Sequence, residues 1–137
     1  MRGRRPELKA VDGGLAASAP APSHIPKAVM AEWNRVTSDL AARALLTPAA
    51  LGAVASYCLA SFTIMQCIEA IERDGAFVRT AEGEPKSHPA MAVMAKSHDL
   101  IARLAGELGL TPASRSRKGL QGKGGTPDDG APPGMDL

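Results

Sequence analysis

Aromatic residues are scarce in this sequence. One tryptophan, one tyrosine and two phenylalanines make up 3% of the 137 residues, although 45% of the chain is apolar. Strands favour aromatic and β-branched side chains, whereas Ala, Leu and Met favour helices. The composition therefore predicts a mainly α protein. Because a core with so few large side chains is small, we expect burial against identical subunits to supply part of the stability.

Cysteine is also rare in this sequence. The two cysteines, Cys58 and Cys67, do not form a Cys-x-x-Cys pair. Without that spacing we interpret them as buried, reduced thiols that act as small apolar side chains, and not as metal ligands or a redox pair. This interpretation predicts a reducing, intracellular compartment.

Catalytic motifs are also missing. The glycine-rich segment 119–125 lacks the spacing and the preceding strand of a phosphate-binding loop. No Ser, Cys or His lies in a recognisable nucleophile context. The sequence therefore predicts a protein that is not an enzyme, with no catalytic residues, no cofactor and no metal site.

The remaining candidate ligands have structural interpretations. His88 precedes Pro89 and is placed to cap a helix, whereas His98 falls on the expected apolar stripe of that helix. Glu69 and Glu72 are three residues apart, a spacing that is usually a solvated helix face when no second such pair exists.

No uninterrupted apolar run reaches the roughly 18 residues that a membrane span needs. The basic start, residues 1–6, is not followed by the apolar core of a secretory signal. We therefore expect a soluble, cytoplasmic protein without a membrane partner.

Acidic residues are absent between Glu107 and Asp128, and positive charge gathers at both ends of a chain whose net charge is only +2. Basic side chains on mobile ends can reach DNA phosphates or a minor groove, and they can also serve only as solubilising tails. The candidate DNA-binding residues are Arg2, Arg4, Arg5 and Lys9 at one end and Arg115, Arg117 and Lys118 at the other.

Three regions follow from composition. Residues 1–24 are expected to be a flexible basic arm with an Ala/Pro/Ser linker, and residues 118–137 a disordered Gly/Pro-rich tail. Between them, residues 25–117 are expected to form a helical oligomerisation and DNA-recognition domain of about three main helices, arranged as a hairpin or bundle.

The expected elements follow apolar spacing and start signals. A first helix should run from about Pro26 to about Leu45 with Trp33 as its anchor. Thr47-Pro48 should start a long helix that ends at Gly75. A possible short β-hairpin turns at Gly83, and a third helix should run from Pro89 to Gly109 with a short turn after Thr111. Its apolar stripe is Met91, Met94, His98, Ile101, Leu104, Ala105 and Leu108.

The main apolar stripe of the long helix consists of Leu51, Val54, Cys58, Phe62, Met65, Ile68 and Ile71. The helix is apolar on more than one face, because Leu59, Ile64 and Cys67 fall outside this stripe. A helix that is apolar nearly all round must be buried on several sides. In so short a chain this pattern predicts subunit contacts. The candidate oligomer interface is Phe62, Met65, Ile68 and Ile71.

The blocks of this sequence, in their order, resemble the small subunits of phage terminases. The resemblance lies in the basic start at residues 1–6, the Trp33 helix and the motif at residues 104–117. It also includes residues 45–47, Tyr57-Cys58 and His88-Pro89. The resemblance covers nearly all of the chain to about residue 118.

The resemblance implies a non-catalytic helical subunit that forms a ring in the cytoplasm of the bacterial host. It binds the packaging start site of the double-stranded viral DNA and delivers it to the large subunit, which holds the ATPase and nuclease. The main alternative is an adaptor that regulates the large subunit with little direct DNA binding. A transcriptional regulator is disfavoured, because no short-turn pair with a polar recognition helix is evident.

Overall fold

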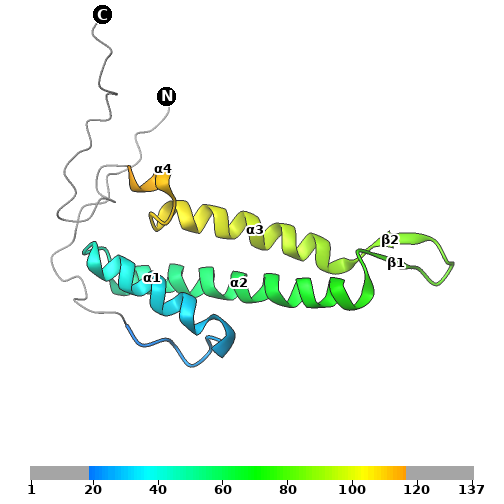
Figure 1. Ribbon diagram of the computed structural model, residues 1–137, viewed down its shortest axis with the longest axis horizontal. Coiled ribbons are helices and arrows are strands. Elements are labelled where there is room, and N and C mark those ends of the chain that lie inside the picture. Colours follow the sequence, from blue (N-terminus) through cyan, green and yellow to red (C-terminus); the bar gives the residue numbers. More distant parts are fainter. Residues whose placement is uncertain (1–18, 117–137) are drawn as a thin grey trace, which may run out of the picture.

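The computed structural model describes residues 19–116, and within them it is mainly helical (Figure 1). A short 3₁₀ turn, Lys27–Val29, leads into α1 (Met30–Ala42), which is followed by the long α2 (Pro48–Asp74). The strands β1 (Phe77–Arg79) and β2 (Pro85–Ser87) come next. Helices α3 (Pro89–Glu107) and α4 (Pro112–Arg115) complete the described chain. The predicted mainly α class and the possible β-hairpin are confirmed.

Proline follows a capping side chain at the start of α2, α3 and α4. The Thr47 hydroxyl accepts a hydrogen bond from the Ala50 amide at 3.2 Å. The His88 Nδ1 accepts one from the Ala90 amide at 3.0 Å. Because the next residue is proline, which has no amide hydrogen and a fixed φ, one unpaired donor of the first turn is removed as well. These start signals were readable from the sequence.

The first helix is shorter than predicted, because it ends at Ala42 and not at Leu45. Ala44 has a φ of 55°, and the Leu45 amide donates to the Leu40 carbonyl at 2.8 Å, which closes the helix end in a left-handed turn. The turn directs Leu46 into the core, where it is fully buried. Burial of Leu46 offsets the strain of a non-glycine residue at positive φ.

The main core lies between α1 and the first half of α2. Trp33 and Val36 of α1 are fully buried against Val54 and Cys58 of α2. Ala19, Ala21 and Ile25 also contact this core. The last six residues of the predicted linker, 19–24, therefore include a packed segment. The predicted role of Trp33 as the anchor of its helix is confirmed.

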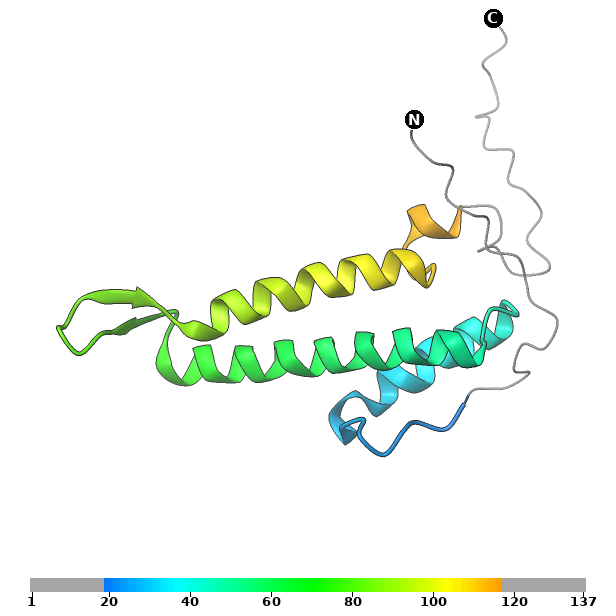
Figure 2. The same ribbon diagram turned by 180° about the vertical axis from the view of Figure 1, so that it is seen from behind.

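Helices α2 and α3 lie side by side and antiparallel, and α1 crosses only the first half of α2 (Figures 1 and 2). Ala60, Ile64 and Cys67 are spaced four and three apart on one face of α2 and are buried. This face is covered by α3. The apolar residues outside the main stripe therefore pack within the chain.

The buried face of α3 differs from the predicted stripe at Met91 and His98, which are exposed. Ser97, Leu104, Ala105 and Leu108 are the buried members. Seven residues make two turns, so the position under Leu104 is Ser97 and not its neighbour His98. The prediction that His98 lies on the apolar stripe was wrong.

The connection between α2 and α3 is a two-stranded antiparallel hairpin, with Phe77 opposite Ser87 and Arg79 opposite Pro85. Gly83 takes the positive φ of 82° that its turn needs. The hairpin extends from one end of the helical pair (Figure 2). Phe77 is 74% exposed on it.

Candidate nucleic-acid interface and subunit face

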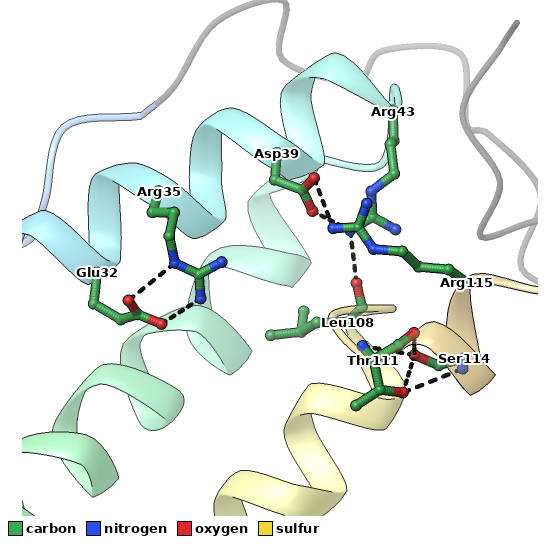
Figure 3. A network of polar contacts seen from close by, with 8 residues as sticks. All are labelled: Glu32, Arg35, Asp39, Arg43, Leu108, Thr111, Ser114 and Arg115. Atoms are coloured by element: carbon green, nitrogen blue, oxygen red, sulfur yellow. Dashed lines mark hydrogen bonds and ion pairs between the residues drawn. The ribbon is translucent and has the colours of Figure 1, made fainter. Parts of the chain in front are cut away.

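A polar joint connects α1 to the C-terminal motif, with Asp39 at its centre (Figure 3). One carboxylate oxygen accepts a hydrogen bond from Arg43 at 2.6 Å, and the other accepts one from Arg115 at 3.0 Å. Arg43 also donates to the backbone carbonyl of Leu108 at 3.0 Å. The joint therefore binds the end of α3 and the short α4 to α1.

The two arginines of the joint differ in burial. The Arg43 side chain is only 8% exposed, whereas that of Arg115 is 47% exposed. Removing the carboxylate would leave Arg43 as a charge inside the protein, which is costly. Arg115 is half solvated, so its ion pair is weak and its guanidinium remains accessible to solvent.

The Leu-Thr-Pro-x-Ser-Arg part of the motif forms a compact capping box. The Thr111 hydroxyl accepts from the Ser114 amide at 3.2 Å, and the Ser114 hydroxyl accepts from the Thr111 amide at 3.1 Å. Ser114 is 1% exposed. The reciprocal bonds fix α4 directly after α3, and this orientation carries Arg115 to Asp39.

Arg115 is the one predicted DNA-binding residue that lies in the described part of the chain. The other six, Arg2, Arg4, Arg5, Lys9, Arg117 and Lys118, lie outside it. The two ends of the described chain are nevertheless both fixed on α1. The Trp33 indole donates to the Ala19 carbonyl at 2.9 Å, and Arg115 binds Asp39. Both ends therefore lie at the α1 end of the molecule, away from the β-hairpin (Figures 1 and 2).

A second ion pair lies farther along the outside of α1. Arg35 makes two hydrogen bonds to the Glu32 carboxylate, and these bonds lower the pKa of Glu32. The same carboxylate raises the pKa of Arg35. Burial raises the pKa of Tyr57, to which the nearby Glu32 charge contributes. Glu32 is therefore ionised at neutral pH, and its negative charge is balanced by the positive charge of Arg35.

The main apolar stripe of α2 is covered for only half of its length. Val54 and Cys58 are fully buried under α1, whereas Met65 is 40% exposed and Ile68 is 44% exposed. Phe62 and Ile71 are partly buried. These four residues, Phe62, Met65, Ile68 and Ile71, are the predicted oligomer interface, and we refer to them as the uncovered stripe. It begins where the core formed with α1 ends.

The apolar character of α2 has a second consequence. By length and composition alone this helix could cross a membrane, with an 18-residue window of mean hydropathy 1.6 of which 22% is buried. The core helix of a water-soluble protein meets the same criterion. Contact with both α1 and α3 makes α2 the central helix of the described fold.

The other titratable candidates do not converge on a site. His88 caps α3 and its Nε2 lies 2.9 Å from an Asp74 carboxylate oxygen, in agreement with the capping role expected for it. Glu69 and Glu72 are exposed, as expected of a solvated pair. Cys58 and Cys67 are buried, and burial raises the pKa of the Cys58 thiol to about 11. Among residues 19–116 no cluster of three metal-ligating side chains occurs.

Sequence reasoning missed Asp39 and Arg43. Their spacing of four residues on a helix was the available signal, since it places an acid and a base on one face. The contact between Arg43 and its carbonyl acceptor Leu108, 65 positions later in the chain, could not be predicted from the pattern alone.

The comparisons with known proteins agree with the resemblance of the sequence blocks. The model of the family described as phage terminase, small subunit, matches residues 30–124. No curated protein and no solved structure matches the chain. The family match spans α1 to α4, including the Asp39 joint and the uncovered stripe. The chain therefore belongs to the phage terminase small-subunit family.

Proposed function

We propose that this chain is the DNA-recognition subunit of a phage packaging terminase. Family membership gives the packaging role, and small subunits of this kind are generally non-catalytic. The protein acts as a homo-oligomer that binds the packaging start site of double-stranded viral DNA and recruits or regulates the large ATPase-nuclease subunit. The observation that supports the proposed DNA binding is the attachment of both ends of the described chain to α1.

The segments that carry the two basic runs join the described chain at residues 19 and 116, and both of these ends lie beside α1. Arg2, Arg4, Arg5 and Lys9 precede the segment held by Trp33, and Arg117 and Lys118 follow Arg115. In an oligomer this charge is repeated in every copy, so that many weak phosphate contacts sum to strong binding. The exposed part of the Arg115 side chain adds a DNA contact, while the ion pair with Asp39 keeps this residue close to α1.

The uncovered stripe is the surface that supports self-assembly. Met65 and Ile68 lie in the second half of α2, and they continue the line of residues that α1 buries in its first half. A second copy that packs on this line buries apolar surface that the chain itself leaves in water. Contacts that repeat head to tail form a ring when the rotation between neighbouring copies closes on itself.

The site of action is the cytoplasm of the bacterial host, where the viral DNA and the large subunit are found. No membrane partner is part of this proposal, and α2 is assigned to the interior of the assembly.

Light scattering, with and without viral start-site DNA, tests assembly and DNA binding together. The full chain should be a discrete oligomer before DNA is added, and it should then take up the duplex. A variant with Gln at Arg2, Arg4, Arg5, Lys9, Arg115, Arg117 and Lys118 should keep the same mass and lose the duplex at the same salt. Equal binding by this variant would refute the basic ends as the DNA contact.

A second variant separates assembly from DNA contact. Met65→Gln with Ile68→Gln should lower the native mass, because both side chains would become buried polar groups between copies. Phe77→Gln changes an exposed apolar residue outside the stripe and serves as the control. If the mass falls for Phe77→Gln and not for the stripe variant, the interface lies at the hairpin.

The alternative function is an adaptor that acts mainly on the large subunit. The exposed Phe77, on a hairpin that points away from α1, is the observation that favours a protein contact of this kind. The ATPase rate of the large subunit with and without this protein, in the absence of DNA, distinguishes the two. Stimulation without DNA favours the adaptor, and stimulation only with DNA favours DNA recognition.

A further inference from the structure

The outward face of α1 has no role in the fold. Trp33, Val36, Thr37 and Leu40 point inward and are buried. Asn34, Arg35 and Ser38 are exposed, and their spacing of one and three residues places them together on the other side of the helix. No other described helix covers this side (Figures 1 and 2).

The side chains on this face are those that recognise bases. Asn pairs with adenine, Arg pairs with guanine, and Ser can donate to or accept from either base edge in the major groove. The groove is about 12 Å wide and admits one α-helix. The Arg35 side chain is 56% exposed while its guanidinium is paired with Glu32 on the same helix.

Charge on the flanks of α1 does not oppose a duplex. Both carboxylates of the helix, Glu32 and Asp39, are bound by arginines. None of the three exposed residues Asn34, Arg35 and Ser38 is acidic. The face is therefore neutral to positive, which a polyanion requires.

The position of α1 supplies the second argument. The chain leaves toward its basic N-terminal run from a residue bonded to Trp33, and toward its basic C-terminal run from one bonded to Asp39. Phosphate contacts position a protein on the duplex, whereas base contacts specify the sequence. Because both ends of the described chain are bonded to α1, phosphate contacts made next to these ends would place the duplex beside this helix.

From this arrangement we infer that α1 enters the major groove and that Asn34, Arg35 and Ser38 read base edges of the packaging start site. The inference rests on the proposed function and goes further by naming the element that gives sequence preference. The basic ends supply affinity, and α1 supplies specificity.

A binding selection from a random duplex library tests this inference without knowledge of the start site. The full-length protein is compared with the variant that carries Asn34→Ala, Arg35→Gln and Ser38→Ala. Arg103→Gln, an exposed arginine on α3, is the control that loses the same charge from a different helix. Thermal unfolding confirms that all three proteins are equally folded.

The intact chain and Arg103→Gln should enrich one common motif. The α1 variant should still bind random duplex, with a salt dependence lowered by at most about one phosphate contact. Its preference for the motif over a scrambled duplex should fall by roughly tenfold or more, the range expected when one or more base-edge hydrogen bonds are removed.

Enrichment of the same motif by the α1 variant, to the same degree, would overturn the inference. Binding by the intact chain with no motif would also overturn it and would leave the proposed DNA-packaging function in place. If the intact chain binds no duplex at all, the proposed function fails together with the inference.

Discussion

Asp39 binds two arginines of unequal burial, and the difference predicts unequal effects on stability. Asp39→Ala leaves the buried Arg43 without its carboxylate, so the free energy of unfolding should fall by about 2 to 3 kcal/mol, somewhat less than for a fully buried pair. Arg115→Ala removes a half-exposed partner and should cost less than about 1 kcal/mol. Urea unfolding at one protein concentration measures both. Equal losses would show that Arg43 does not depend on Asp39.

Asp74 predicts how stability responds to acid. Hydrogen bonds from Arg73 and His88 hold the pKa of this carboxyl well below its usual range. A carboxyl with a depressed pKa in the folded state stabilises the protein above its unfolded pKa of about 4, and this contribution is lost as the pH falls below that value.

The variant Asp74→Asn should therefore flatten the acid side of the stability profile while leaving the shape of the profile above pH 6 unchanged. The group is on the surface, so the effect is reduced by solvent. Thermal unfolding temperatures between about pH 2 and 7 test this. A variant whose profile falls in acid as steeply as that of the parent would exclude Asp74 as the source.

At the scale of elements, the starts of α2, α3 and α4 were predicted from the sequence because each needs only a capping side chain and a proline next to it. The faces were harder to predict. Ile64 and Cys67 could not be assigned to α3 from the pattern, because apolar side chains do not specify which neighbour buries them. His98 was wrongly placed on the buried stripe because it is the residue next to the buried Ser97, and adjacent residues of a helix face different sides.

The cap of the longest helix gives a prediction at this scale. Thr47→Ala removes the acceptor for the Ala50 amide and should lower the free energy of unfolding by about 1 kcal/mol. Thr47→Ser keeps the hydroxyl and should lose much less. Chemical denaturation distinguishes them, and a serine variant as unstable as the alanine variant would show that the methyl group, and not the cap, matters.

For the whole molecule, the two ends of the described chain, residues 19 and 116, lie at the opposite end of the helical unit from the β-hairpin (Figure 1). Under the proposed function, this polarity places the DNA contact at one end of each subunit and leaves the hairpin end for other contacts. A homo-oligomer built along the uncovered stripe would repeat both ends around the assembly.

The strength of DNA binding should therefore depend steeply on salt. Replacing Arg2, Arg4, Arg5 and Lys9 with Gln should reduce the slope of log affinity against log salt by about 0.9 for each phosphate that a subunit no longer neutralises. Fluorescence anisotropy over a salt series measures the slope. An unchanged slope, with affinity reduced equally at all salt concentrations, would indicate that these residues act through the fold.

The sequence by itself determined the helical class, the helix starts, the hairpin turn at Gly83 and the family, because these depend on local spacing and on blocks in order. Only the tertiary structure decided which apolar residues remain uncovered and which helix holds both ends of the described chain. Contacts such as Arg43 with Leu108 and Trp33 with Ala19 join positions far apart in the chain. Their partners are selected by packing in three dimensions, which no local pattern specifies.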